Sequence, residues 1–502
     1  MTRLERVPEN PILMPPRRRV VLVHPQGHNW YAGAKDVVRI ANAMPPHGLM
    51  MLAAVLKRAG VEASILDFFA HPASADDAVA AVLAREPDCV GFTATTAGFL
   101  PGYRLAEQLK AARPTLPVVF GGAHPTSLWR ELLERYPALD AIAVGEGEET
   151  LVELALAGFR PSRDIPGLAF RETTGEPVFA GPRPLLRDLD TLPRPAYEEL
   201  VGFPKSYTMP IFNYPRSPAT TMITSRGCPY ACSYCDRSVF GSSFRYHSAQ
   251  YLIDHLTYLK QRFGIRHVGL YDDNFMMKRA HVTEFAELLL KRRLGITFNC
   301  IGRSDHLDPE LLRLMKRAGC WMINIGIESG DEGLIQQHRK NAEQARVIEA
   351  IQMIRAAGIR VKGLFMIGIP GETQQSIEST IEFATRRRLD DANLTKFTPF
   401  PGSPIYARVR EYGRFDEDWD QMNCTNFVFI PNGLSFEQLE RDYLRFYRSF
   451  WGGPRGLWKV LSMAWKSPES LWRFVSQFRD FLEAERSMRA RPASGSRPAE
   501  AH

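Results

Sequence analysis

Three cysteines stand close together near the middle of this 502-residue chain. Cys228, Cys232 and Cys235 are separated by three and then two residues in the stretch SRGCPYACSYC. Thiolates at such spacings hold a zinc ion or an iron–sulfur cluster. A structural zinc site needs four ligands, and no fourth is evident nearby, since His247 lies twelve residues beyond Cys235. A four-iron cluster held by three cysteines instead leaves one iron open to a substrate or cofactor.

The elements around the cysteines must place them at one edge of a sheet. Apolar runs alternate with helical patterns, for example a helix over 309–319 with Asp308 as its N-cap and Gly319 as its end. Six such units predict a partial (β/α)6 barrel, whose chemistry gathers at the carboxyl ends of its strands. The cysteines directly follow the first strand. The expected strands are 219–225, 265–271, 297–302, 322–328, 362–368 and 392–399.

A second alternating series precedes this one and predicts an open, doubly wound domain. Such a sheet binds ligands beyond the carboxyl ends of its strands. The segment 160–218 is rich in Pro and Arg, and we expect a linker with short strands there. The expected strands of the first domain are 17–25, 61–67, 89–96, 117–122 and 141–148, and its helices are 48–60, 75–87, 103–114 and 127–137.

Composition and charge limit the class of protein. Seven cysteines, an odd number in a long chain, are not a secreted disulfide scaffold and fit a reducing cytoplasm. We see neither a secretory signal nor an apolar run long enough to span a membrane. Residues 441–502 carry 12 Lys and Arg against 6 Asp and Glu, so most of the net charge of +7 belongs to the tail. The near-neutral body gives no reason to expect nucleic acid as a partner.

The stretch RGCPYACSYC resembles the cluster motif of radical S-adenosylmethionine (SAM) enzymes. The resemblance implies a [4Fe-4S] cluster whose open iron chelates SAM, and cleavage of SAM to a 5′-deoxyadenosyl radical that abstracts hydrogen from the substrate. It also implies an electron donor such as flavodoxin or ferredoxin. Alternatives are a non-catalytic iron–sulfur electron-transfer or binding protein, and a radical SAM methylthiotransferase acting on RNA.

The same resemblance suggests SAM-contacting residues after four later strands of the barrel. They match positions that hold the methionyl amino group, the carboxylate or ribose, and the adenine. The alternative at each position is an ordinary solvated loop or helix cap. The residues are Asp272, Asp273, Arg303, Glu328, Ser329 and Gly368.

The N-terminal series looks like the cobalamin-binding domain that precedes the barrel in one large class of these enzymes. The resemblance rests on the stretches 45–60, 90–96, 120–126 and 144–150. The motif Asp-x-His-x-x-Gly is absent, which implies cobalamin bound without a protein histidine on cobalt. The alternative is a doubly wound domain that only supports the barrel or binds another ligand. Candidate cobalamin contacts are Thr93, Thr95, Thr96, Gly121, Gly122, His124, Gly145 and Gly147.

Four tryptophans recur every seven residues near the C-terminus, at positions 451, 458, 465 and 472, together with Lys459, Lys466, Arg473 and Arg479. Glycines and prolines at 452–454 and 468 break the segment, so we expect two short helices. Two interpretations remain open, which can coexist: peripheral contact with an anionic membrane, and packing of the tryptophans onto the barrel.

The predicted organisation is a disordered N-terminus (1–19), a cobalamin-binding-like domain (20–159), a linker (160–218), a radical SAM partial barrel (219–435), a helical segment (436–490) and a disordered tail (491–502). The expected function is modification of an unactivated carbon of a small molecule, by methyl transfer or by oxidative cyclisation. The family includes enzymes resembling the anaerobic magnesium-protoporphyrin monomethyl ester cyclase and the hopanoid methylases. A lipid or a tetrapyrrole is therefore the expected kind of substrate, and the expected location is the cytoplasm or the inner membrane face.

Overall fold

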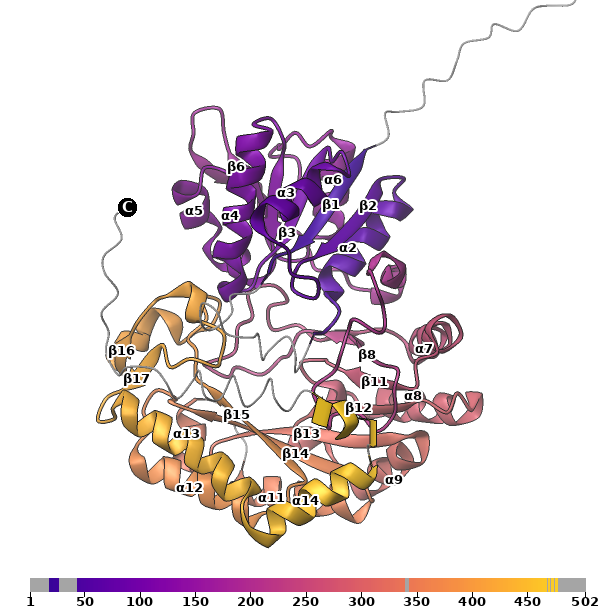
Figure 1. Cartoon of the computed structure of the whole chain (residues 1–502), viewed down its shortest axis with the longest axis vertical. Coiled ribbons are helices and arrows are strands. Elements are labelled where there is room, and N and C mark those ends of the chain that lie inside the picture. The colour runs from indigo at the N-terminus through magenta and orange to yellow at the C-terminus, as the bar shows by residue number, and fades with distance from the viewer. Residues whose placement is uncertain are drawn as a thin grey trace, which may run out of the picture.

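A computed structural model describes residues 18–26, 43–338, 343–466, 468–469, 471–473 and 475–476 of the chain. The predicted disorder of 491–502 and of nearly all of 1–19, and the predicted role of Arg479, lie outside these residues. Two lobes are visible in Figure 1, with the N-terminal lobe above and the larger C-terminal lobe below. Among the described residues, no helix is both long and apolar enough to cross a membrane.

The upper lobe is a parallel sheet with helices on both faces, as its alternating pattern predicts. The strands pair in the order β2-β1-β3-β4-β5, with helices α2 and α6 on one face and α3, α4 and α5 on the other (Figure 1). The strands are β1 (Arg19–His24), β2 (Glu62–Asp67), β3 (Cys89–Thr93), β4 (Val118–Gly121) and β5 (Ala141–Ala143). The helices are α2 (His47–Arg58), α3 (Ala75–Leu83), α4 (Thr96–Ala112), α5 (Ala123–Arg135) and α6 (Glu148–Leu156).

The segment expected as a linker contributes to this sheet as well. Strands β6 (Leu168–Arg171) and β7 (Pro177–Phe179) form an antiparallel hairpin that pairs with β5 and extends the sheet to seven strands. The two strands of the hairpin are short, and an isolated hairpin of this kind is only marginally stable in water. Its stability therefore depends on the pairing of β6 with β5. The rest of the segment runs down to the lower lobe.

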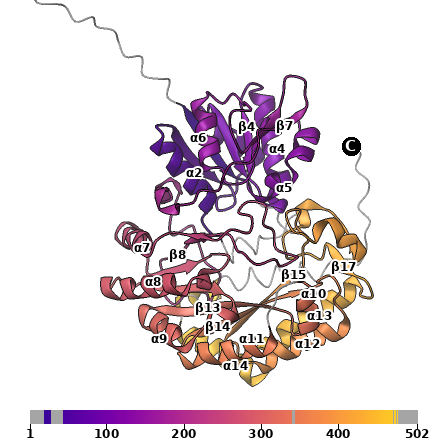
Figure 2. The same cartoon turned by 180° about the vertical axis from the view of Figure 1, so that it is seen from behind.

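The lower lobe is an open sheet of six parallel strands, which confirms the predicted partial barrel. Strands β15 and β8 are its two edges, and helices α9, α11 and α12 cover its outer side (Figure 2). The strands are β8 (Ala219–Met222), β11 (His267–Leu270), β12 (Thr297–Gly302), β13 (Cys320–Glu328), β14 (Arg360–Ile367) and β15 (Asp391–Lys396). The helices are α7 (Ala249–Phe263), α8 (Arg279–Arg292), α9 (Pro309–Ala318), α10 (Glu332–Gln337), α11 (Gln344–Ala356) and α12 (Gln374–Arg386).

The predicted limits of one barrel helix are confirmed in detail. The Asp308 carboxylate accepts a hydrogen bond from the Leu311 amide at 2.9 Å and so caps α9. Gly319 ends the helix with φ of 106°, in the left-handed region that glycine adopts without strain.

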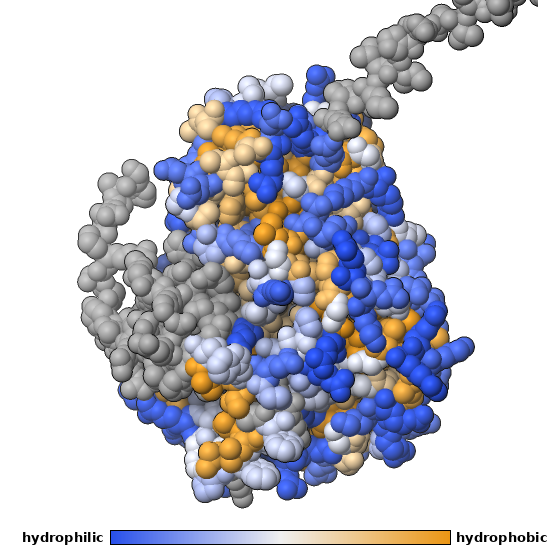
Figure 3. All heavy atoms as spheres, turned by 45° about the vertical axis from the view of Figure 1, so that its right-hand side comes forward, coloured by the Kyte–Doolittle hydropathy of each residue, from blue (hydrophilic) through white to orange (hydrophobic). Residues whose placement is uncertain are grey.

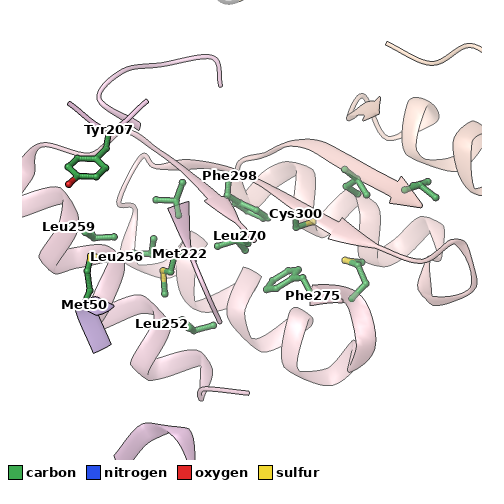
Figure 4. Packing of buried hydrophobic residues seen from close by; sticks show 14 of the residues in the cluster. Met50, Tyr207, Met222, Leu252, Leu256, Leu259, Leu270, Phe275, Phe298 and Cys300 are labelled. Atoms are coloured by element: carbon green, nitrogen blue, oxygen red, sulfur yellow. The ribbon is translucent and has the colours of Figure 1, made fainter. Parts of the chain in front are cut away.

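The larger apolar cluster of the described residues continues from the barrel into the upper lobe. Figure 4 shows Met222, Leu270 and Phe298 of the barrel strands packing against side chains of α7, with Met50 of α2 and Tyr207 at one end of the same cluster. All of these side chains are buried. Because an apolar interface between domains resists relative motion, this core fixes the upper lobe over the carboxyl ends of the barrel strands.

Four further short strands and two further helices are found in the part of the chain that the structure describes. The cysteine loop lies between β9 (Ser225–Arg226) and β10 (Arg245–Tyr246), and a second small sheet pairs β16 (Gly413–Phe415) with β17 (Phe429–Pro431). Helix α13 (Phe436–Trp451) packs on α12, and α14 (Gly453–Lys466) follows after the predicted break at Gly452.

Candidate active site between the two lobes

The three cysteines lie in the loop that follows β8, at the carboxyl edge of the barrel. Cys232 is buried, Cys228 is half-buried and Cys235 is exposed. Within the described ranges, no three His, Cys, Asp or Glu side chains converge on one metal ion. A four-iron cluster does not require such convergence, because each thiolate binds a different iron atom. Three thiolates in one loop fit a four-iron cluster, which takes one thiolate on each of three irons.

Asp272, which follows β11, holds the strand that leads into this loop. Its Oδ1 accepts the amide N–H groups of Thr224 at 2.6 Å and Ser225 at 2.7 Å, and its Oδ2 accepts the Thr224 hydroxyl at 2.5 Å. Burial raises the pKa of Asp272 to about 6, although these hydrogen bonds act in the opposite direction. Both carboxylate oxygens are thus engaged with the segment that leads into the cysteine loop, and a contact of Asp272 with the amino group of SAM stays a prediction.

Asp273 lies nearer the cysteines. One of its oxygens accepts the Gly227 amide N–H at 3.1 Å, next to Cys228 in the chain. The residue is exposed to solvent, although the surrounding protein atoms still desolvate its carboxylate enough to raise its pKa. Its place beside the first cysteine leaves Asp273 as the predicted contact for the amino group of SAM.

Arg303, after β12, stacks on a tyrosine of the cysteine loop. Its guanidinium carbon lies 3.8 Å from the centre of the Tyr230 ring, and its Nε donates to Asp305 at 3.1 Å. The Tyr230 hydroxyl lies 2.8 Å from Nε2 of His306. The structure thus brings the predicted Arg303 to the cluster loop, together with His306, which the sequence analysis missed.

The far side of the loop is held by His338. Its Nδ1 lies 2.7 Å from the Ser233 hydroxyl and its Nε2 lies 2.8 Å from the Pro370 carbonyl oxygen. Since Nε2 must donate to a carbonyl, Nδ1 accepts the hydroxyl proton, and the imidazole is neutral. Burial lowers the pKa of His338, consistent with this state. His338 therefore ties the cysteine loop to the loop after β14.

The other predicted SAM contacts follow β13 and β14. Glu328 ends β13 with φ of 67°. Its carboxylate acts on Tyr234: the pKa of this tyrosine is raised mainly by burial and, as the second cause, by the negative charge of Glu328. The Ser329 hydroxyl lies 2.9 Å from that of Thr380, so it is engaged with α12. Gly368, with φ of 84°, donates its amide N–H to the Glu372 carboxylate. Of these residues, Glu328 is the one whose charge acts on Tyr234, which lies between Cys232 and Cys235 in the chain.

A large, mainly apolar cavity opens above the barrel, at the carboxyl edge of the upper sheet. The ends of β1, β3, β4 and β5 form its roof, α2 closes one side, and the cysteine loop supplies Ser225, Arg226, Val239 and Phe240. Open α/β sheets bind ligands in this crevice, where strand order reverses between β1 and β3. Glycines widen it: a Cβ at Gly91 would stand 2.9 Å from Leu22 Cδ2.

The predicted cobalamin contacts divide into two groups. Thr93, Gly121, Gly122, Gly145 and Gly147 line the cavity. Thr95, Thr96 and His124 do not belong to its lining: Thr95 and Thr96 begin α4, and His124 is buried against Phe99 and Trp419, with ring centres 5.0 Å and 4.5 Å away. Burial lowers the pKa of His124 to about 3. His124, at the start of α5, thus packs into an aromatic contact with Trp419 of the lower lobe instead.

The cavity also contains residues that the sequence analysis missed. His47, His247 and His255 line it, and neither ring nitrogen of His255 has a hydrogen-bond partner among the described residues. Glu146 and Glu148 line it too, beside the predicted glycines. Burial acts to raise the pKa of Glu146, but hydrogen bonds from Arg245 and Arg226 outweigh it and lower the pKa. The repeated Gly-Glu pairs of VGEGEET were the available signal.

Comparisons with known proteins agree with this geometry. The Radical SAM superfamily matches residues 222–384, and the B12 binding domain matches residues 34–155. An uncharacterised methyltransferase of Pyrococcus horikoshii is 30% identical over 419 residues, which cover 83% of this chain and 89% of that protein. The anaerobic magnesium-protoporphyrin IX monomethyl ester cyclase of Rubrivivax gelatinosus is 27% identical, with 86% of this chain and 77% of the relative covered.

A solved structure shares the whole architecture. The radical SAM methyltransferase TsrM from Kitasatospora setae matches with a TM-score of 0.64 and 19% identity, covering 88% of this chain and 84% of its own. At this identity the match shows a common fold of an upper sheet over a partial barrel. Together with the matched domains and the relatives, it means that this chain belongs to the cobalamin-dependent radical SAM enzymes, whose cofactors are a [4Fe-4S] cluster, SAM and cobalamin.

Proposed function

We propose that this enzyme transfers a methyl group to an unactivated carbon of a small, largely apolar molecule. The observation that carries the proposal is that both lobes line one cavity: the upper lobe contributes the glycines of its sheet, and the lower lobe contributes residues of the cysteine loop. With the cofactors bound, the cluster and SAM supply the radical that removes hydrogen, and cobalamin supplies the methyl group. If the source of the radical and the source of the methyl group both face this cavity, one bound substrate can undergo hydrogen abstraction and methyl transfer without leaving it.

Roles for individual residues follow from this arrangement. We assign Cys228, Cys232 and Cys235 to three irons of the cluster, and Asp273, Arg303 and Glu328 to the surroundings of SAM. Gly121, Gly122, Gly145 and Gly147, with Thr93, would allow the corrin and its nucleotide tail to approach the backbone closely. Asp272 and His338 would position the cysteine loop through its backbone and Ser233. Support comes from the contacts of the loop and from the lining of the cavity.

The substrate class is inferred from the surroundings of the cavity. Apolar side chains from both lobes predominate in its lining, including Leu52, Phe92, Phe120, Ile223 and Phe240. Apolar walls favour an apolar ligand because burying both surfaces removes them from water. The name of one relative specifies a magnesium porphyrin ester, which is a flat, largely apolar molecule. A tetrapyrrole or a lipid is therefore the substrate class to test.

The test is an anaerobic assay of the full chain. The protein is reconstituted with iron, sulfide and cobalamin, then given SAM, a reductant and an extract of lipids and pigments, and its nucleoside products are measured by mass spectrometry. Methyl transfer predicts that 5′-deoxyadenosine and S-adenosylhomocysteine rise together and depend on extract and cobalamin, since one SAM supplies the radical and another the methyl group. A rise in 5′-deoxyadenosine alone would refute methyl transfer and favour cyclisation.

We further propose that the C-terminal helices contact an anionic membrane. Trp458, Trp465 and Trp472 are 72%, 88% and 72% exposed, so these three do not pack onto the barrel as one prediction had it. Leu457 and Leu461 are exposed on α14 as well. Apolar patches appear at the lower end of the molecule in Figure 3, at the height at which Figure 1 shows α14. Exposed tryptophans beside basic residues favour a charged membrane interface.

Sedimentation with phosphatidylglycerol vesicles tests this contact. The double variant Trp458→Ser/Trp465→Ser is expected to lose most vesicle binding, because each tryptophan contributes apolar area at the interface. The matched control is Leu156→Ser/Val201→Ser, two apolar residues exposed by 54% and 62% away from α14. Equal binding of both variants and the wild type would refute the proposal.

The electron donor is proposed to be a flavodoxin or ferredoxin that approaches the exposed side of the loop at Cys235. Support comes from the exposure of this cysteine. A reduced flavodoxin should then replace a chemical reductant in the assay above, and failure of both carriers to support SAM cleavage would refute this assignment.

A further inference from the structure

Two glutamates and two arginines form a buried ion network between the lobes. Glu146 lies in the turn after β5, and Glu148 begins α6, both in the upper lobe. Arg226 in β9 donates to Glu146 at 2.6 Å and to Glu148 at 2.5 Å, and Arg245 in β10 donates to Glu146 at 2.8 Å. All four side chains are only 8–12% exposed. The charges balance, with two of each sign.

On the barrel side, the network ends at the cysteine loop itself. Arg226 is two residues before Cys228 in the chain. Its neighbours on both sides are fixed by the barrel, since the Ser225 amide donates to Asp272 at 2.7 Å and the Gly227 amide to Asp273 at 3.1 Å. A shift of the Arg226 side chain therefore pulls on the backbone that leads directly into the first cysteine.

On the other side, the network ends at the wall of the cavity. Gly145, Glu146, Gly147 and Glu148 all line it, and so does Arg226. Gly145 has φ of 84°, and the Glu146 carboxylate also accepts the Leu186 amide at 3.1 Å. A molecule that fills the cavity thus touches the same turn that holds Arg226.

The burial of these charges gives the network one preferred arrangement. Charges taken out of water are costly unless each keeps its partner, so a half-broken network would leave an uncompensated charge. An intermediate position of the turn relative to the cysteine loop is therefore disfavoured. Buried ionic groups of this kind serve to fix register between elements.

We infer that this network couples the two cofactor sites: cobalamin in the cavity sets the position of the cysteine loop, and thereby the affinity of the cluster for SAM. Arg226 and Glu146 are positioning residues, which act on the cluster through the loop. The inference needs both cofactors but does not depend on which reaction they support.

Equilibrium binding to the full chain tests the coupling. The cluster is reconstituted and kept oxidised so that SAM is not cleaved, and the Kd of SAM is measured by equilibrium dialysis with and without hydroxocobalamin. We expect cobalamin to tighten SAM binding in the wild type by about fivefold or more, the lower end of typical allosteric coupling. By reciprocity, SAM must tighten cobalamin binding by the same factor, which an absorbance titration measures separately.

Two variants and one control assign the coupling to the network. Glu146→Gln and Arg226→Lys should bring the coupling factor close to one. Glu153→Gln is the matched control, because it breaks a contact of α6 with Arg183 that does not reach the cysteine loop, and it should keep the wild-type factor. Iron content is measured for each protein, and if Arg226→Lys loses its cluster, Glu146→Gln decides, since Glu146 lies in the other lobe.

Two outcomes would overturn the inference: a wild-type coupling factor of one, and full coupling retained in Glu146→Gln. Neither requires turnover, so a failure of methyl transfer in the activity assay would leave this result unaffected.

Discussion

Replacement of Asp272 by alanine and by asparagine should have very different effects on the cluster. Asp272 accepts three hydrogen bonds from Thr224 and Ser225 and is only 3% exposed. Alanine leaves three buried donors without a partner, at about 1–3 kcal/mol each, or roughly 3–6 kcal/mol with some relaxation. Asparagine keeps an oxygen for the two amide N–H groups, and its NH2 donates to the Thr224 hydroxyl, so it loses on the order of 1–2 kcal/mol.

The assay is anaerobic reconstitution at pH 7.5, with iron and sulfide measured per chain. At this pH the carboxylate is ionised, since its pKa is about 6. Asp272→Asn should bind close to the wild-type amount of iron, whereas Asp272→Ala should bind little. Asp273→Ala, which loses one hydrogen bond from Gly227, is the control and should retain its cluster. If asparagine were as damaging as alanine, the negative charge and not the hydrogen-bond geometry would be what matters, and the reasoning would fail.

Three further results are expected. Cys232→Ala should abolish SAM cleavage, and 5′-deoxyadenosine formed at the wild-type rate would contradict the cluster assignment. Gly122→Ala should weaken cobalamin binding in an absorbance titration, because the backbone φ of Gly122 is 104° and the new Cβ would stand 2.8 Å from the Ala94 carbonyl oxygen. Gly121→Ala is the control and should have a milder effect, because the atom nearest to its new Cβ would be 3.6 Å away. Equal losses of affinity in the two variants would count against this reasoning. Burial raises the pKa of Glu372 from its usual 4.5 to about 8. Between these two pH values the folded protein therefore holds a proton on Glu372 that the unfolded protein lacks. The free energy of unfolding should consequently fall by about 1.4 kcal/mol per pH unit as the pH rises through this range. Urea denaturation at pH 6 and pH 8 should show this loss in the wild type and a smaller one in Glu372→Gln; identical losses would disprove the assignment.

Much of the architecture followed from local patterns. The alternation of apolar runs and helices predicts both sheets, and the Asp308 cap and Gly319 end of α9 occur as expected. These features depend on residues within a few positions of one another. The hairpin β6–β7 was harder to predict, because its short strands are stabilised by pairing with β5 and not by their own sequence.

The candidate site likewise has residues whose place local sequence predicts and residues whose place it does not. Gly122 and Gly145 line the cavity as expected, because glycines at strand ends keep the backbone open wherever the sheet is placed. His124 looked like a cavity residue from its neighbours in the sequence, yet it packs against Trp419, almost 300 residues away. Which surroundings a side chain at a helix start meets depends on the lobe that docks against it, and local sequence carries little information about that.

The sequence by itself determined the kind of chemistry. Cys228, Cys232 and Cys235 lie within eight residues, and the resemblance of this stretch to the radical SAM motif predicts a cluster with an open iron without reference to any distant contact. Only the tertiary structure decided what surrounds that cluster. Arg226 meets Glu146 across 80 residues, and Thr224 meets Asp272 across 48. The first pair forms because apolar burial docks the two lobes in one orientation, and the second because β8 and β11 pair side by side in the barrel sheet. Once desolvated, these charged groups are held to the partners that the fold supplies.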